Sequence, residues 1–161
     1  MQKITPCLWF DGKAEEAAKF YTSIVKNSKI KAITRYGEGG SKASGQSEGT
    51  VMTVVFELDG QEMLALNGGP YFKFSEAVSL IINCTTQKEI DGYWEKLSAG
   101  GQKSQCGWLK DRYGLSWQIV PTVLGKMMQG KDEMKSDAVM KVMLQMTKLD
   151  IKTLQQAYDR A

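Results

Sequence analysis

The feature that most constrains this chain is a pattern of segments that occurs twice along it. The first copy begins with the strand-like run Ile4–Phe10. An apolar stripe with the spacing of one helix face follows it: Ala14, Ala17, Ala18, Tyr21 and Ile24. Three more strand-like runs come next: Ile30–Tyr36, Val51–Leu58 and Gln61–Asn67. The last two flank Asp59-Gly60, a dipeptide favoured in tight hairpin turns because both residues tolerate positive φ.

The second copy begins with the strand-like run Val78–Cys84, after which Thr86 and Glu89 have the spacing of a capping box. The stripe of the next helix, Ile90, Tyr93, Trp94 and Leu97, repeats the internal spacing of Ala17, Phe20, Tyr21 and Ile24. Strand-like runs at Lys103–Asp111 and Leu115–Val120 complete this copy. Because both copies read strand, helix and then further strands, we expect a duplicated βαβββ module.

These patterns predict an α+β fold with two βαβββ modules and a helical C-terminal extension. Residues 1–121 form the domain, with module one at 1–74 and module two at 75–121. The extension, 122–161, has helical spacing and no strand pattern, and we expect it to pack on the domain or on a dimer partner. Its many methionines suit either core packing or an adaptable contact surface.

The composition excludes several classes of function. The 161 residues carry a net charge of +3 with the basic residues dispersed, so nucleic-acid binding is not expected. The three cysteines are an odd and widely spaced set, which is typical of reduced thiols. A signal peptide and an apolar run long enough for a membrane span are both lacking, so we expect a cytoplasmic protein with no membrane partner. The chain contains no histidine at all.

Four separated motifs carry a resemblance to a known family. They are TPCLWFDGKAEEAAKFY at 5–21, LNGGPYFKF at 66–74, YWEKL at 93–97 and CGWLKDRYGLSWQIVP at 106–121. They resemble the PhnB-like family, which carries the name 3-demethylubiquinone-9 3-methyltransferase, and the segment MLQMTKLDI at 143–151 is similar to it as well. The resemblance implies a vicinal oxygen chelate, or glyoxalase-like, fold.

The same resemblance implies where a metal would be held in metal-using members of the superfamily. The histidine positions correspond to Thr5 and Ser79, the glutamate position to Gln118, and the fourth position to Leu66 or Leu64. Neutral hydroxyls bind transition metals weakly, and an aliphatic side chain does not bind them. We therefore expect no metal and no cofactor.

Strand alternation directs a set of side chains toward the inward face, where a ligand would lie. The candidate ligand-binding residues are Thr5, Cys7, Trp9, Ser79, Ile81 and Gln118 on that face, and also Trp108, whose indole offers apolar contact area with a polar N–H. Two roles stay open for Gln118, a ligand contact or a structural amide. Trp117 is next to it on the strand and therefore faces the opposite side, so we expect Trp117 in the core. No catalytic residue is identified.

Three local expectations concern turns and loops. Asp11 is placed to cap the first helix, and the Gly/Ser-rich segment Gly37–Gly49 is expected to be a loop that covers the cavity as a lid. Asp111 and Arg112 are expected to form a surface turn pair.

The leading functional hypothesis is a metal-free protein whose cavity binds a small organic molecule of apolar or aromatic character, in a homodimer. One alternative is a metal-independent enzyme acting on a quinone-like or other small organic substrate. The other is a homodimeric interaction module whose cavity is vestigial.

Overall fold

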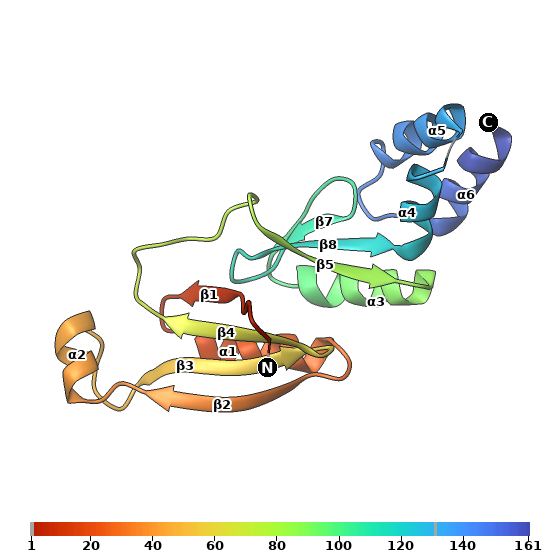
Figure 1. The fold of residues 1–161 in the computed structure, drawn as a ribbon. Coiled ribbons are helices and arrows are strands. Elements are labelled where there is room, and N and C mark those ends of the chain that lie inside the picture. Colours follow the sequence, from red (N-terminus) through yellow and green to blue (C-terminus); the bar gives the residue numbers. More distant parts are fainter. Residues whose placement is uncertain (1, 131) are drawn as a thin grey trace. The chain divides into compact units, whose positions relative to one another are not determined.

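The computed structural model describes residues 2–130 and 132–161, and they form two compact units that meet in sequence at Phe74 and Ser75. Within these residues the chain has six helices and two four-stranded sheets (Figure 1). The α+β fold with two βαβββ modules and C-terminal helices is therefore confirmed.

The first unit contains one sheet and a helix that covers one of its faces (Figure 1). Its elements are β1 (Cys7–Phe10), α1 (Ala14–Ile24), β2 (Lys29–Arg35), α2 (Glu38–Ser44), β3 (Val51–Leu58) and β4 (Gln61–Asn67). The strand order is β1-β4-β3-β2, with β1 parallel to β4 and the other pairs antiparallel.

Alternation along the strands builds the core of this unit. Leu8 and Phe10 are buried, whereas Cys7 is exposed and Trp9 is half-buried. The remaining strands and α1 add further buried residues: Val54, Phe56, Met63, Ala65, Ala14, Ala17, Ala18 and Tyr21. Because side chains on a strand alternate between its faces, the apolar side of the sheet lies against the alanine-rich stripe of α1.

The β3–β4 hairpin turns at Asp59-Gly60, where both residues have positive φ, 45° and 85°. This turn was predicted from the dipeptide and is confirmed. The segment Gly37–Gly49 was expected to be an irregular loop, and that was wrong in part, because α2 occupies Glu38–Ser44. The helix ends at Gly45, whose φ of 72° suits glycine and stops helical propagation.

The cap of α1 also differs from the expectation. Asp11 does not cap the helix, whose N-cap residue is Lys13, without a side-chain hydrogen bond. Instead the backbone N–H of Ala14 donates to Oδ1 of Asn67, at 2.9 Å. Asn67 stands at the end of β4, next to β1, so a strand side chain satisfies the helix terminus from outside the helix.

The second unit repeats the arrangement with shorter strands. Its elements are β5 (Ser79–Cys84), α3 (Gln87–Ser98), β6 (Gln102–Lys103), β7 (Trp108–Lys110) and β8 (Ser116–Pro121). The strand order is β5-β8-β7-β6, and β5 is parallel to β8. Trp117 is buried with Leu109 and Ile119, as its parity predicted, on the face that packs against α3.

The cap of α3 is made by its own segment. Thr86 accepts a hydrogen bond from the backbone N–H of Glu89, as predicted. The carboxylate of Glu89 accepts in return from the backbone N–H of Thr85, one residue before the position that a capping box uses.

The C-terminal extension contains α4 (Thr122–Met128), α5 (Glu133–Met143) and α6 (Ile151–Arg160) and belongs to the second unit. Its buried cluster is Leu124, Met127, Val139, Leu149 and Leu154. Most of the methionines thus pack within the extension, while Met134 is exposed.

Candidate functional site

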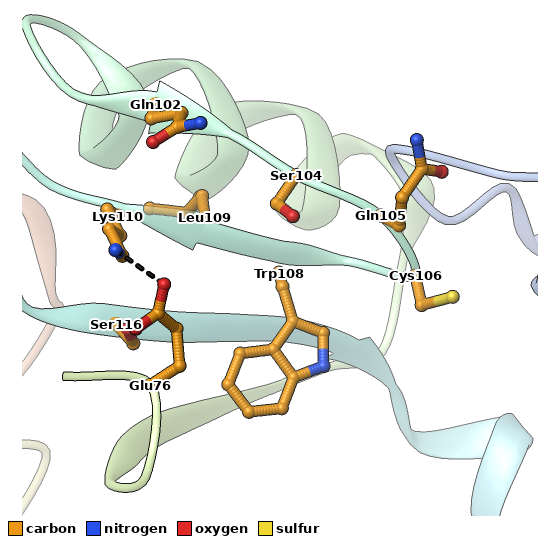
Figure 2. Close-up of a pocket in the computed structure, with 9 residues that line it drawn as sticks. All are labelled: Glu76, Gln102, Ser104, Gln105, Cys106, Trp108, Leu109, Lys110 and Ser116. Carbon is orange, nitrogen blue, oxygen red and sulfur yellow. Dashed lines mark ion pairs between the residues drawn. The ribbon is translucent and has the colours of Figure 1, made fainter.

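The second unit has a hollow of ≈ 380 Å³ beside β7, drawn in Figure 2 and called here the β7 hollow. Its lining residues are Glu76, Gln102, Ser104, Gln105, Cys106, Trp108, Leu109, Lys110 and Ser116. Trp108 and Lys110 alternate with Leu109, so their side chains lie on the face of the sheet opposite α3. Figure 2 shows the indole ring and the lysine side chain on that common side.

Four of the predicted ligand-binding residues lie on this same face. Ile81, Gln118 and Trp108 stand directly opposite one another on β5, β8 and β7. Nε2 of Gln118 donates to the hydroxyl Oγ of Ser79, at 2.9 Å. Of the four, Trp108 lines the β7 hollow, while the Gln118–Ser79 pair continues the polar surface along β8 and β5.

Ser116 is the unusual member of the lining. Its residue exposure is 1%, and among the described residues its Oγ is the buried side-chain polar atom with no hydrogen-bond partner. A buried hydroxyl without a partner costs free energy, because its hydrogen bonds to water are lost and not replaced. Ser116 is one of the residues that line the hollow.

An ion pair lies over the same part of the hollow. Nζ of Lys110 contacts Oε1 of Glu76 at 2.5 Å, and the two side chains are 34% and 63% exposed. The hydrogen bond from Lys110 holds the pKa of the Glu76 carboxyl below its usual value. Glu76 belongs to the segment before β5, and the dashed line in Figure 2 marks its ion pair with Lys110.

The C-terminal extension fixes the rim of the hollow. The backbone N–H groups of Cys106 and Gly107 donate to the carbonyl oxygens of Met146 (2.8 Å) and Thr147 (2.7 Å). Gly107 has a φ of 82°, and a Cβ atom there would lie 2.8 Å from the carbonyl oxygen of Ile119. Glycine is therefore required at this position, because the backbone conformation and the close contact both exclude a side chain.

Asp111, at the end of the hollow's strand, was expected on the surface, and that was wrong. It is 2% exposed. Its Oδ1 accepts from the backbone N–H groups of Tyr113 and Leu115, and its Oδ2 accepts from Nε1 of Trp117, at 2.8 Å. The carboxylate thus organises the turn between β7 and β8 and holds the buried indole. Nε of Arg112, still exposed, donates to the carbonyl of Ala99.

The other three predicted site residues belong to the first unit. Thr5 and Cys7 are exposed, and Thr5 precedes β1. The indole of Trp9 donates from Nε1 to the carbonyl of Gly69, at 2.8 Å, and its ring meets Phe72 edge to face. The ring lies so close to Gly68 that a Cβ there would be 2.1 Å from it. The polar end of Trp9 is thus occupied within its own unit.

Sequence reasoning missed most of the hollow's lining. Lys110 and Ser116 share the parity of Trp108 and Gln118, so the alternation that placed Gln118 on the inward face also points to them. Glu76 carries no such signal, because it precedes the strand and reaches Lys110 only through the folded chain.

The residues at the metal positions do not fit a transition metal. Ser79 and Gln118 offer a hydroxyl and an amide, both neutral, and they bond to each other. Among residues 2–130 and 132–161, three or more His, Cys, Asp or Glu side chains do not gather into a set that could hold an ion.

The arrangement of the strands defines the class of protein. Two consecutive βαβββ units, each with its first strand parallel to its last, are the glyoxalase-like, or vicinal oxygen chelate, fold. The family model described as 3-demethylubiquinone-9 3-methyltransferase matches residues 2–120, and the chain belongs to this family. The match ends before 143–151, so the similarity of that segment stays a prediction.

Solved structures agree with this assignment. The putative 3-demethylubiquinone-9 3-methyltransferase, PhnB protein, from Bacillus cereus is 41% identical, covering 75% of this chain and 100% of that one, with a TM-score of 0.67. Protein PA1353 from Pseudomonas aeruginosa is 19% identical over 75% and 98% of the chains, with a TM-score of 0.60. The fosfomycin resistance protein FosX from Listeria monocytogenes is 12% identical over 80% of this chain and 98% of that one, with a TM-score of 0.55. The last two share the fold.

No curated protein matches this sequence. Among the helices of the described residues, none combines the length and apolar character that crossing a bilayer requires.

Proposed function

We propose that this chain binds a small organic molecule in the β7 hollow. The observation that carries the proposal is the pairing of an apolar indole wall, Trp108, with a buried hydroxyl that lacks a partner, Ser116. Ligand sites combine mostly apolar walls with a few polar groups that fix orientation. A ligand that contacts both side chains would bury apolar surface and satisfy the hydroxyl.

The size of the hollow supports a small ligand. Its volume of ≈ 380 Å³ lies near the lower end of the range of about 300–1,000 Å³ that small-molecule sites occupy. One ring system with a polar substituent suits such a volume better than a dinucleotide or a long chain.

Methyl transfer is not the function that this geometry favours. A cofactor with a nucleotide moiety is commonly held by a glycine-rich turn that leads from a strand into a helix. Here β1 leads into α1 through Asp11-Gly12-Lys13, and β5 leads into α3 through Thr85-Thr86. Neither connection has that composition.

Further contacts and context belong to the same proposal. Ser79, Ile81 and Gln118 extend the site along β5 and β8, while Thr5, Cys7 and Trp9 stay candidate ligand-binding residues of the first unit by itself. A homodimer and a cytoplasmic location complete the proposal. The location is supported by three free cysteines, of which Cys84 is buried with its pKa raised to about 11 by that burial.

The test is a fragment screen read from the indole N–H resonances of the four tryptophans in uniformly ¹⁵N-labelled protein. Trp108 is assigned with Trp108→Phe, and the buried Trp94 and Trp117 serve as internal controls. A saturable shift of the Trp108 signal with small aromatic fragments, with the two core signals unmoved, supports the proposal. A screen in which the Trp108 signal never moves, or moves only together with the core signals, overturns it.

A further inference from the structure

We infer that the β7 hollow selects a planar aromatic carboxylate, and that the Glu76 side chain occupies the place of the ligand's carboxylate when the hollow is empty. The inference rests on the proposed function and names the chemistry of its ligand.

The first step is spacing. Trp108 and Lys110 are two residues apart on β7 and project to the same face, so their Cα atoms are separated by about 6.6 Å, at ~3.3 Å per residue. An aromatic ring with a carboxylate attached directly to it spans this distance. The ring would lie against the indole while the carboxylate reaches Nζ of Lys110.

The second step is the hydrogen bond that the hollow still lacks. Ser116 stands directly opposite Lys110 across the β7–β8 pair. In such pairs the Cβ atoms lie only about 4.5–5.5 Å apart. A carboxylate has two oxygens, so one can pair with Lys110 while the other accepts from the Ser116 hydroxyl, which is buried and has no partner.

The third step is charge. A ligand carboxylate that pairs with Nζ of Lys110 must displace the Glu76 carboxylate from it, and this breaks the Glu76–Lys110 ion pair. A neutral ligand offers the half-buried ammonium no counter-charge and so leaves its ion pair with Glu76 in place, and a cationic ligand would be repelled by it. An entering carboxylate restores the pairing. Because Glu76 is 63% exposed and precedes β5, it can turn to solvent without disturbing a strand.

Glu76 therefore acts as an internal competitor. Its carboxylate satisfies Lys110 in the empty protein and must be displaced by the ligand's own carboxylate. Removing the charge of Glu76 should strengthen the binding of an aromatic carboxylate, whereas removing the charge of Lys110 should abolish the preference for one.

The experiment uses benzoate as the probe, with benzamide as its neutral counterpart and cyclohexanecarboxylate as its non-aromatic counterpart. Affinity is read from titration of the Trp108 indole resonance. We expect benzoate to bind more tightly than either counterpart. Glu76→Gln should tighten benzoate roughly two- to fivefold, the range of an exposed ion pair, and leave benzamide unchanged.

Three further variants complete the design. Lys110→Met should make benzoate and benzamide equal, and Ser116→Ala should weaken benzoate with the fold unchanged by thermal melt. The matched control is Glu95→Gln, which removes an acid of the second unit that pairs with Lys103, at 2.9 Å, outside the hollow. Glu95→Gln should bind benzoate with the same affinity as the protein without substitutions.

The outcomes separate the inference from the proposal beneath it. If neutral fragments shift Trp108 while benzoate binds no better than benzamide and Glu76→Gln has no effect, the inference is overturned and the proposed function stands. If Glu95→Gln tightens benzoate as much as Glu76→Gln does, the effect is one of net charge, and the inference is again overturned. If no probe or fragment shifts Trp108, both fail.

Discussion

The two modules share the order of their strands and first helix, but the first adds α2 between β2 and β3, and they differ in the length of one antiparallel strand pair. In the first unit, β2 and β3 contain 7 and 8 residues and pair along most of their length. The corresponding strands of the second unit, β6 and β7, contain 2 and 3 residues. The β7 hollow lies beside this short pair, and the C-terminal extension holds its rim. The hollow is thus found beside the shorter of the two strand pairs, although both sheets have the same strand topology.

The modules also satisfy their buried polar groups differently. In the first, Asn67 at the end of β4 caps α1, donates from Nδ2 to the carbonyl of Val51, and accepts at its own carbonyl from the hydroxyl of Tyr36. In the second, Thr86 caps α3 locally, and Asp111 instead organises the turn before β8. The buried polar residue with the most hydrogen bonds described here therefore lies at the end of β4 in the first module and directly after β7 in the second.

The largest effect that we expect from this difference is that of Asp111→Ala. The substitution leaves two backbone N–H groups and the Trp117 indole without their acceptor, and each buried donor that loses its partner costs about 1–3 kcal/mol. We expect a loss of about 3–5 kcal/mol, below the simple sum because water reaches part of the turn. Urea denaturation measures it. The exposed Asp11→Ala, in the first module, should change stability by less than about 0.5 kcal/mol.

Asn67→Ala should cause the next largest loss of stability. It removes the cap of α1 and the bond to Val51, so we expect a loss of about 2–3 kcal/mol from these two contributions. Asn83→Ala, at an exposed position on β5, is the matched control. Equal melting temperatures for the two variants would contradict the role given to Asn67. A loss from Asp11→Ala as large as that from Asn67→Ala would assign the cap to Asp11 after all.

Replacing either of two glycines of the second unit by alanine should change stability, with opposite signs at the two positions. Gly107→Ala should destabilise by about 1–3 kcal/mol, because φ is 82° and the new methyl group would meet the Ile119 carbonyl. Gly92→Ala, inside α3 where nothing lies within 4 Å of the added atom, should stabilise by about 0.5–1 kcal/mol. Thermal melts of both variants decide. A stabilising Gly107→Ala would show that the rim is not held as described.

The smallest effect concerns pH. The pKa of Asp150 is lowered, first by the hydrogen bond from the Thr153 hydroxyl and then by the Thr153 backbone N–H at the start of α6. Since its folded pKa lies below the unfolded value near 3.9, its contribution is fully present above that value and is lost as the pH falls through the folded pKa. Asp150→Asn should flatten the stability profile below about pH 4. Parallel profiles for the two proteins would contradict this.

Much of the fold could be predicted because its signals are local. The Asp59-Gly60 turn, the stripes of α1 and α3 and the cap at Thr86 each depend on neighbours in sequence. The helix α2 was missed because its residues, rich in Gly and Ser, have low helix propensity.

The buried and paired polar groups of both units were harder to predict. Asn67 and Glu76 act on partners that lie far along the chain, Ala14 and Lys110. Asp111 bonds to residues 2 to 6 positions away, but no periodic pattern marks it as buried. Strand parity placed Gln118 on the inward face, and it contained the information for Lys110 and Ser116 as well. Strand parity does not show how deeply a side chain is buried, so nothing in the sequence indicates that the Ser116 hydroxyl is buried without a hydrogen-bond partner.

The bonds from Cys106 and Gly107 to Met146 and Thr147 also bear on the order in which the protein takes shape during synthesis. Ribosomes deliver the chain from its amino end, so the first module has all its own residues once Phe74 has emerged. The backbone amides of the loop at 105–107 cannot form their hydrogen bonds until the acceptors, Met146 and Thr147, have been synthesised. A nascent chain thus has all residues of the first sheet early and those of the rim late, and any ligand of the β7 hollow would meet a complete rim only after Met146 and Thr147, between α5 and α6, had been made.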